Sequence, residues 1–382
     1  MIDFNFSYKC YSCMACEFMC PVNAISFSNN LLPIVDETLC INCGKCEKNC
    51  IALEKTENSE EIPKDWEGYT FKSYSDEIRK NSSSGGLFYS VAKSFIENGG
   101  YVSGGVYDDN WMPKHIVTNS LDLIKKMMGS KYVKSDLNMV YKQIQSLIQS
   151  GNSVLFTGTP CQVNSIKKVF NNHQLLTCIS VVCHGSIERD VWKAYLDKEQ
   201  EKGSIVNITM RDKSRGWSNY GLTFTFDNGK KDSSFRNEDG YFLKCYTDGV
   251  LERDRCLNCK IKGKSILSDI IMGDGWGIEK MFPDISDELG ISAVICLNSK
   301  GKELLDSVKS DNFVQKINAK EIVSSNSRIM IPAELDTRMK KFREDFRNNP
   351  NDIQINCEKI VKKNRSLVHK MKHMAEKIIK IR

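Results

Sequence analysis

The middle of the chain alternates between short hydrophobic strands and amphipathic helices. Apolar spacing predicts helices over 87–97, 136–149 and 161–170, and strands over 101–107, 114–118, 154–156 and 175–182. Such alternation is typical of a partly parallel sheet, whose ligands bind at the carboxyl ends of its strands. After residue 205 the pattern changes to strands, which include a hairpin at Asp227-Asn228-Gly229.

The two ends of the chain follow other patterns. Short strands over 24–27 and 32–35 lie among closely spaced cysteines, and the chain beyond Pro332 is helical and charged. We therefore expect a mixed α+β and α/β fold. Its expected parts are a small cysteine-rich module at 1–57, a linker at 58–80, the two regions of a mixed-sheet core at 81–152 and 153–330, and a helical basic tail at 331–382. The expected last core strand is 291–297.

The tail carries a pattern of its own. From Lys359 to Arg382 there are nine Lys or Arg residues and one Glu. Apolar residues recur at spacings of three and four, at Ile360, Leu367, Met371, Met374, Ile378 and Ile381. This pattern predicts a helix that lies on the protein's own core. A helix that joins two chains into a homodimer, or one that contacts an acidic surface, stays open as an alternative.

Composition and charge narrow the class of protein. The chain has 382 residues and a net charge of +6, and its 16 cysteines are spaced like metal ligands, which indicates a reducing cytoplasm. No apolar run is long enough to span a membrane, and the first eight residues do not resemble a signal peptide. No interleaved aromatic and basic motif indicates nucleic-acid binding. We expect a cytoplasmic protein with no membrane span and no nucleic-acid partner.

Eight of the cysteines form two copies of the spacing C-x2-C-x2-C-x3-C. They are Cys10, Cys13, Cys16 and Cys20, then Cys40, Cys43, Cys46 and Cys50. In bacterial-type ferredoxins this run holds two [4Fe–4S] clusters, and the fourth thiolate of each run binds the cluster of the other run. We therefore expect Cys50 to join Cys10, Cys13 and Cys16, and Cys20 to join Cys40, Cys43 and Cys46. Zinc also binds C-x2-C pairs, but it fits this doubled spacing poorly.

Four further cysteines lie where a ligand would lie. Cys256 and Cys259 form a single C-x2-C pair, which is half of a metal site. Cys161 is in the first turn of a predicted helix, and Cys183 follows a predicted strand. Both would therefore lie at the same edge of the sheet. Spacing alone leaves two interpretations open, a third cluster or small buried residues at Cys161 and Cys183.

Six segments occur in an order that resembles a known family. They are Ser83-Ser84-Gly85-Gly86, Gly129-Ser130-Lys131-Tyr132-Val133, Gly158-Thr159-Pro160-Cys161-Gln162, Cys183-His184-Gly185, Cys256-Leu257-Asn258-Cys259 and Gly273-Asp274-Gly275-Trp276-Gly277. As a set, over residues 1 to 330, they resemble the family of beta subunits of coenzyme F420 hydrogenases and dehydrogenases, in its bacterial branch with a fused ferredoxin. The resemblance implies an oxidoreductase with FAD, in which 1–57 is a ferredoxin-like module and the mixed-sheet core at 81–152 and 153–330 is flavin-binding. It also implies a core [4Fe–4S] cluster, whose ligands would be Cys161, Cys183, Cys256 and Cys259.

A flavin is also expected on chemical grounds, because iron–sulfur clusters transfer single electrons whereas hydride carries two. The candidate FAD-binding residues are Ser83, Ser84, Gly85, Gly86, Gly129, Ser130, Lys131, Gly158, Thr159 and Pro160. The Ser-Gly-Gly segment could hold the pyrophosphate at a helix start, or it could be an ordinary helix entry. No G-x-G-x-x-G follows a strand, so a Rossmann-type site is not supported.

Two residues are weak candidates for catalysis. Lys131 would place a positive charge near the flavin or a phosphate, or it would be a solvated surface lysine. His184 would donate a proton, or it would only orient the loop of the neighbouring cysteine. The catalytic residues are otherwise unknown.

The predicted function is electron transfer between a hydride-carrying coenzyme, a deazaflavin or similar, and a one-electron redox protein or enzyme. The electrons would pass through FAD and the [4Fe–4S] clusters. The alternative is a ferredoxin-type relay fused to a binding domain without flavin, for example in polysaccharide biosynthesis.

Overall fold

The computed structural model of the chain describes residues 9–54, 61–335 and 337–363. Its largest element is a mixed eight-stranded sheet in the order β13-β3-β12-β11-β7-β6-β4-β5. The strands are β3 (Glu67–Ser73), β4 (Tyr101–Tyr107), β5 (Pro113–Thr118), β6 (Val154–Gly158), β7 (Leu176–Val181), β11 (Ile270–Asp274), β12 (Ser292–Cys296) and β13 (Asn312–Ile317). β4, β6, β7 and β11 are parallel to one another, and β5, β12, β3 and β13 each pair antiparallel with their neighbours. The predicted mixed α/β class is confirmed.

Helices cover both faces of this sheet because its central strands are apolar on both sides. Phe156 packs into one buried cluster, together with residues of α6 and α7, and its neighbour Leu155 packs into the opposite one, with residues of α4. The helices are α3 (Asp76–Asn81), α4 (Leu87–Glu97), α5 (Leu121–Met127), α6 (Val140–Gln149), α7 (Pro160–Val169), α12 (Ser299–Asp306) and α13 (Ala319–Ser325). The helical spacing of Leu87 and Val91 explains why α4 buries one stripe against the sheet.

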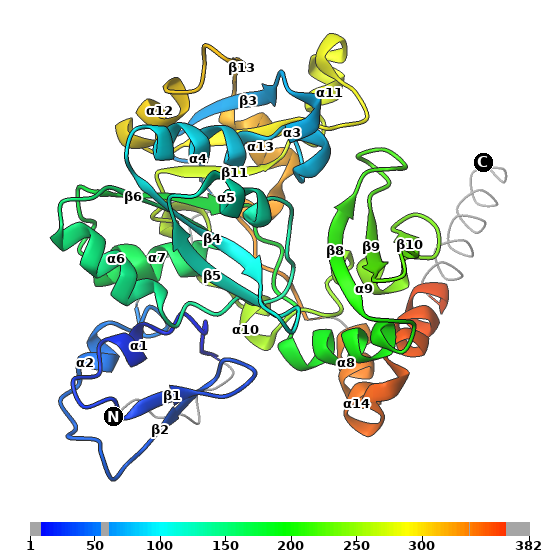
Figure 1. Cartoon of the computed structure of the whole chain (residues 1–382), viewed down its shortest axis with the longest axis horizontal. Helices are drawn as coiled ribbons and strands as arrows, with labels where there is room; N and C mark the ends of the chain where they lie inside the picture. The colour runs from blue at the N-terminus through cyan, green and yellow to red at the C-terminus, as the bar shows by residue number, and fades with distance from the viewer. Residues whose placement is uncertain (1–8, 55–60, 336, 364–382) are drawn as a thin grey trace, which may run out of the picture.

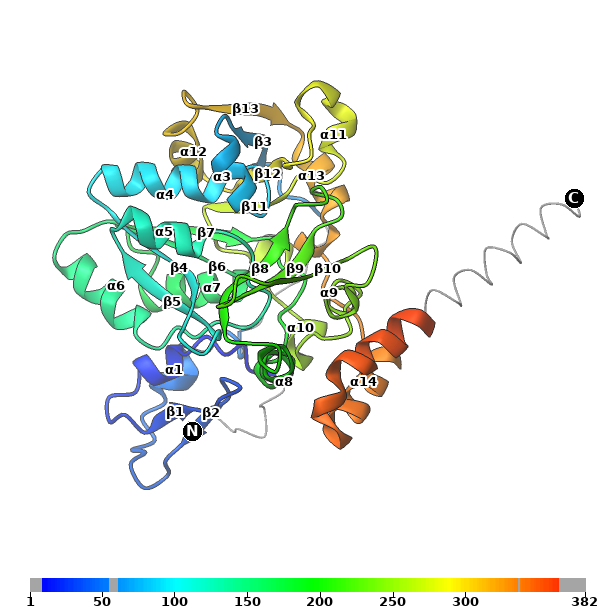
Figure 2. The ribbon, with the colours of Figure 1, turned by 45° about the vertical axis from the view of Figure 1, so that its right-hand side comes forward.

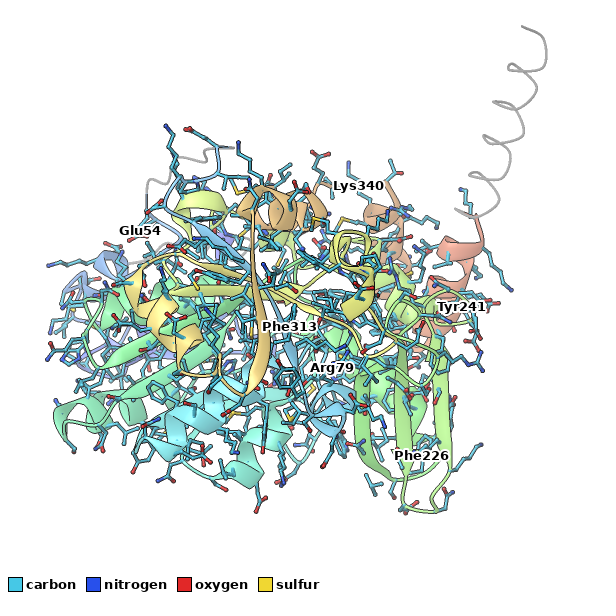
Figure 3. The ribbon with its side chains drawn as sticks, turned by 90° about the horizontal axis from the view of Figure 1, so that it is seen from above. Glu54, Arg79, Phe226, Tyr241, Phe313 and Lys340 are labelled. Carbon is cyan, nitrogen blue, oxygen red and sulfur yellow. The ribbon has the colours of Figure 1, made fainter. Side chains whose placement is uncertain are left out.

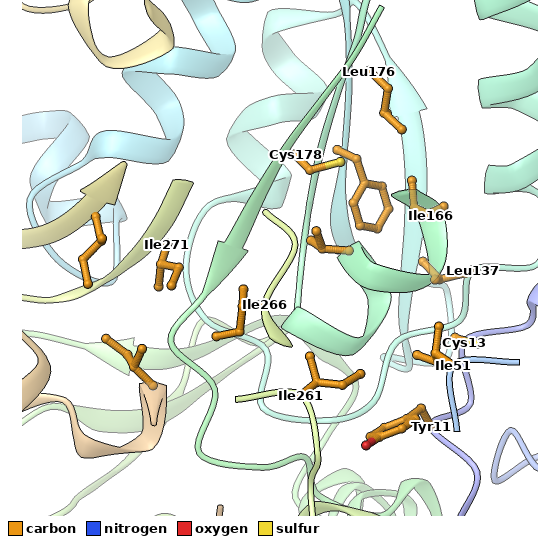
Figure 4. Close-up of a cluster of buried hydrophobic side chains, with 14 of the residues drawn as sticks. Tyr11, Cys13, Ile51, Leu137, Ile166, Leu176, Cys178, Ile261, Ile266 and Ile271 are labelled. Atoms are coloured by element: carbon orange, nitrogen blue, oxygen red, sulfur yellow. The ribbon is translucent and has the colours of Figure 1, made fainter. Parts of the chain in front are cut away.

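The N-terminal module consists of α1 (Ala15–Phe18), β1 (Ile25–Phe27), β2 (Pro33–Val35) and α2 (Lys45–Lys48). It lies beneath α6 and α7 (Figure 1), and the ring of Phe18 stacks on that of Tyr141 at 5.4 Å between centroids. The Tyr141 hydroxyl donates to the Cys13 carbonyl at 2.7 Å. Tyr11, Cys13 and Ile51 belong to the same buried cluster as residues of the α/β core (Figure 4). The module is therefore docked on the core through buried contacts.

A second, smaller sheet lies beside the main one (Figures 1 and 2). It contains β8 (Ile205–Asp212), β9 (Gly221–Phe226) and β10 (Lys231–Phe235), in antiparallel order. α8 (Arg189–Gln200), α9 (Tyr241–Thr247), α14 (Thr337–Asn348) and a helix over 353–363 pack against it. Seen from above, Phe226 and Tyr241 lie on this part, away from Phe313 on β13 of the main sheet (Figure 3). The core between the smaller sheet and its helices is aromatic, and the ring centroids of Trp192 and Phe224 in it are 6.2 Å apart.

Several sequence predictions need correction. Residues 67–80 were expected in a linker, but they form β3 and α3. β3 lies between β12 and β13, and its Tyr69 and Phe71 side chains are buried. The expected boundary at 152/153 falls inside one sheet, since β6 pairs with β4. The last core strand is β13 and not β12.

The tail prediction is described in part. The helix over 353–363 buries Ile360 in the core of the smaller sheet, while Leu367, Met371, Met374, Ile378 and Ile381 lie outside the described residues. Within the described ranges, no helix combines the length and apolar character that crossing a membrane requires.

Candidate functional site

Cys10, Cys13, Cys16 and Cys50, here called the first module group, lie close together. Burial raises the pKa values of Cys10, Cys13 and Cys16, and the charge of Cys50 adds to the rise in each of the three. The structure thus brings Cys50 to the first run and not to its own. Ser12 is left-handed, with φ of 50°, and its backbone N–H donates to the Cys10 sulfur at 3.3 Å.

Cys20, Cys40, Cys43 and Cys46, here called the second module group, line one small cavity. The loop repeats the backbone of the first run, because Asn42 has a φ of 51° where Ser12 has 50°. Cys43 is exposed, so this group reaches the protein surface. Among the described residues, no three His, Cys, Asp or Glu side chains are placed to hold a single metal ion.

Cys161, Cys183, Cys256 and Cys259, here called the core group, meet at the carboxyl edge of the main sheet. β6 and β7 are neighbours, so the loops that follow them carry Cys161 and Cys183 to the same place. The short helix α10 (Asp254–Leu257) brings Cys256. Burial raises the pKa of Cys183 to about 11, and the charges of Cys161 and Cys259 contribute to the rise. The pKa of Cys256 is also raised by burial and then by Cys183.

Cys161 differs from the other three thiols. Burial disfavours its thiolate, but the Lys134 ammonium 3.4 Å from its sulfur and the Thr159 hydroxyl together hold the pKa of Cys161 below its usual value. Thr159 is the N-cap of α7, and Pro160 occupies its first helical position, one residue before the predicted start. The start of α7 therefore favours a thiolate at Cys161.

The core group and the first module group are joined by direct contacts. The Tyr11 hydroxyl accepts hydrogen bonds from the Arg255 guanidinium and, at 3.0 Å, from the Lys260 backbone. Arg253 donates to the Ser12 hydroxyl at 2.7 Å. Tyr11 and Ser12 lie between Cys10 and Cys13, so the loop of the first module group packs on the segment that carries Cys256 and Cys259.

A cavity of about 350 Å³ lies between the two sheets and ends at the core group. Its volume is within the usual range for small-molecule sites. Eight of the ten predicted FAD-binding residues line it: Ser83, Ser84, Gly86, Gly129, Ser130, Lys131, Gly158 and Thr159. Gly85 and Pro160 do not. A Cβ at Gly85 would lie 2.3 Å from the Phe71 carbonyl oxygen, and the Gly85 backbone N–H donates to the Ser292 hydroxyl. This glycine therefore serves the packing of the loop.

One end of the cavity is formed by the start of α4. Gly86 is the N-cap, with φ of 94°, and Gly86, Leu87 and Phe88 line the space. The first N–H groups of a helix have no intrahelical partner and favour anions. The Ser83 and Ser130 hydroxyls, 2.7 Å apart, lie at the same end.

The two catalytic candidates take different positions. The ammonium of Lys131 lies 3.1 Å from the Met128 carbonyl oxygen at the end of α5, and burial lowers the pKa of Lys131 to about 8, so it is not a solvated surface lysine. His184 is exposed to the cavity. Enclosure by the surrounding protein, followed by the charges of Arg328 and Lys262, lowers the pKa of His184 to about 4, which leaves the ring neutral near pH 7.

Arg211 is a site residue that sequence reasoning missed. It lies on β8 of the smaller sheet and makes two hydrogen bonds of 3.0 Å to Asp274 at the end of β11. It also donates to the Ser83 carbonyl at 2.9 Å and lies 3.8 Å from the ring centroid of Tyr220. The Arg211 contact gives the Gly-Asp-Gly-Trp-Gly segment a structural role, because Asp274 of this segment, bound to Arg211, ties both walls of the cavity together.

Arg236 is a second missed residue. It lines the cavity, and its buried Nε has no hydrogen-bond partner within the described residues. The other cations of the lining are engaged by protein atoms: Lys131 with carbonyl oxygens, Lys134 with Cys161, and Arg211 with Asp274. The rings of Phe, Tyr and Trp in the lining are Phe88, Tyr132, Tyr220, Tyr246 and Trp276. The cavity thus combines flat apolar surfaces with an available positive charge.

Comparisons with known proteins agree with these observations. Residues 151–322 match the sequence profile of a family described as coenzyme F420 hydrogenase/dehydrogenase, namely the C terminus of its beta subunit. The F subunit of the F420H2 dehydrogenase of Methanosarcina mazei is 21% identical over 312 residues, which cover 74% of this chain and 84% of that protein. A chain of the F420-reducing [NiFe] hydrogenase complex of Methanosarcina barkeri has 16% identity and a TM-score of 0.46, over 80% of this chain and 91% of its own length. The profile match over residues 151–322 and the related dehydrogenase subunit support the resemblance that the motifs indicated.

Proposed function

We propose that this chain, an oxidoreductase of the beta-subunit type, moves electrons between a hydride carrier and a one-electron redox partner. It would hold FAD in the cavity and one [4Fe–4S] cluster in each of its three cysteine groups. The observation that carries this proposal is the continuity of the parts. Cys183 belongs both to the cavity lining and to the core group, and Arg253 and Tyr11 connect the core group to the first module group.

The lining of the cavity suits the chemistry of FAD. The start of α4 and the two serine hydroxyls fit a pyrophosphate, and the aromatic rings fit a planar ring system. The buried Thr157 hydroxyl and the Arg236 Nε lack hydrogen-bond partners among the described residues, which is expected where a polar ligand completes the site. When bound, FAD would exchange hydride on one side and single electrons on the other.

The chain's own residues would set the geometry. Arg211 and Asp274 fix the distance between the two walls, and Arg211 also donates to the Ser83 carbonyl. The loops after β6 and β7 bring Cys161 and Cys183 together, and Cys183 lines the cavity, so a ring bound at this end would lie next to the core group. The first module group follows, and the second module group reaches the surface at Cys43.

The hydride carrier is proposed to be an anionic coenzyme, a deazaflavin such as F420 or a similar molecule. Support comes from the name of the related dehydrogenase and from Arg236, whose charge is available in the cavity. The one-electron partner would dock near Cys43. The related dehydrogenase protein is named as one subunit of an enzyme. By analogy, another protein that assembles with this chain is a natural partner.

Protein purified without oxygen tests this proposal. We expect about 12 iron atoms per chain, four for each cluster, and one flavin released by acid. Zinc in place of iron would refute the cluster assignment. Iron without any flavin would refute the flavoprotein assignment and favour a relay joined to a binding domain.

The hydride carrier is tested by anaerobic reduction of the same protein. Reduced deazaflavin and the two nicotinamide coenzymes would be compared by the rate at which the bound flavin is bleached. We expect the deazaflavin to react; reaction with none of the anionic carriers would refute that part of the proposal.

A further inference from the structure

Arg253 lies between the core group and the first module group. It immediately precedes α10, which carries Cys256, and its side chain is buried. The guanidinium donates to the Ser12 hydroxyl at 2.7 Å, and the backbone N–H of Ser12 donates to the Cys10 sulfur at 3.3 Å. One side chain therefore contacts the loops of both groups.

The charge of Arg253 is held between the loops of both groups. On the core side, the Cys256 backbone N–H donates to the Arg253 carbonyl at 2.9 Å, so the arginine lies one turn before this thiol. Its counter-charge is Glu188, whose carboxylate lies 3.2 Å from the Arg253 Nε and is 32% exposed. Water therefore screens the carboxylate more than the guanidinium, and a net positive field remains between the two groups.

We propose that Arg253 is a positioning residue for electron transfer. Its charge raises the reduction potentials of the core cluster and of the first module cluster together. The physical reason is that reduction adds a negative charge to each cluster, and a buried cation stabilises the more negative state. Glu188 opposes this effect. The inference rests on the proposed function, because it requires clusters in both groups.

Arg189 provides a matched control. It also joins the module to the core, but its guanidinium donates to the carbonyl oxygens of Asn29, Pro113 and Lys134. Its removal should loosen the same interface without removing the charge that lies between the cysteine groups.

The test is a redox titration of the anaerobically purified full chain, followed by electron paramagnetic resonance. We expect Arg253→Gln to shift two of the three cluster potentials to more negative values and to leave the third in place. Arg253→Lys should restore most of the shift. Glu188→Gln should move the same two potentials in the positive direction, and Arg189→Gln should leave all three unchanged.

Two outcomes would overturn the inference. One is unchanged potentials in Arg253→Gln protein that retains its iron, and the other is an equal shift of all three. If Arg253→Gln fails to fold, the Glu188→Gln variant serves as the test, because Glu188 is partly exposed. Reduction potentials that do not become more positive in Glu188→Gln would also overturn the inference. Wild-type protein that lacks the core cluster would instead refute the proposed function, and its iron content reveals this before any variant is titrated.

Discussion

Replacing Arg211 with Met should destabilise the chain strongly, because it leaves a buried carboxylate without its partner. The side chain of Arg211 is 3% exposed and that of Asp274 is 19% exposed, and the pair makes two hydrogen bonds of 3.0 Å. Breaking a buried ion pair by removing one partner costs about 3–5 kcal/mol. With an unfolding entropy of roughly 2.1 cal/mol/K per residue, a chain of this length loses about 1.2 °C of Tm per kcal/mol. We therefore expect Tm to fall by about 4–6 °C.

The assay is thermal unfolding of anaerobic protein, followed by intrinsic tryptophan fluorescence, with two further variants. In the double variant with Asp274→Asn, the unpaired charge is also removed, so the loss should be no larger than that of Arg211→Met alone. Arg215→Met is the control, because Arg215 and Glu238 form an exposed pair on the same part of the protein, worth about 0–1 kcal/mol. If Arg211→Met melts at the wild-type temperature, or if the double variant loses more Tm than Arg211→Met, Arg211 does not hold the cavity walls together.

Three further predictions concern the thiols, the cavity and pH. Replacing Cys50 with Ser should remove the cluster of the first module group and leave about 8 iron atoms per chain; loss of the second module cluster instead would show that each run binds its own cluster. Replacing Arg236 with Gln should raise the KM for an anionic hydride carrier about 10- to 100-fold, as expected for a lost hydrogen bond to a charged group, while flavin content and kcat stay near wild type; loss of flavin would place the arginine on FAD. His115, whose pKa burial lowers to about 4, binds a proton less readily folded than unfolded, so its contribution to stability is present above pH 6.5 and is lost as the pH falls towards 4. His115→Gln should therefore flatten the decline of Tm between pH 7 and pH 5, and parallel declines in the two proteins would exclude this cause.

Local patterns predicted the elements that are long and regular. The helix over 87–97 and the strand over 101–107 have the bounds that the apolar spacing indicated, because each buries one periodic set of side chains. The fourth cysteine of each run was placed with the other run from spacing alone, and the structure has the same grouping. β3 was missed because it follows an acidic segment, and only its pairing with β12 and β13 buries it.

The charged residues of the site could not be predicted, because they belong to no local motif. Arg211 is part of an ordinary strand, and its partner Asp274 lies 63 residues away in sequence. Arg253 and Ser12 are separated by 241 residues. Such pairs arise only when the fold brings two loops together. The segment around Asp274 gave a signal through its glycines, whereas a single buried arginine gives none.

The buried contacts between module and core argue for a fixed relay and against a mobile ferredoxin domain. Tyr11 lies in the main buried cluster, and the Tyr141 hydroxyl bonds the Cys13 carbonyl directly. Releasing the module would expose these apolar side chains and would leave the Arg253 guanidinium without Ser12. Leaving a buried cation without a hydrogen-bond partner costs free energy. The Arg253–Ser12 contact, which lies between the two thiol groups, therefore also favours the docked arrangement. The distance between these groups is thus set by folding, and in the proposed relay the exposed Cys43 would mark the side on which electrons are exchanged with another protein.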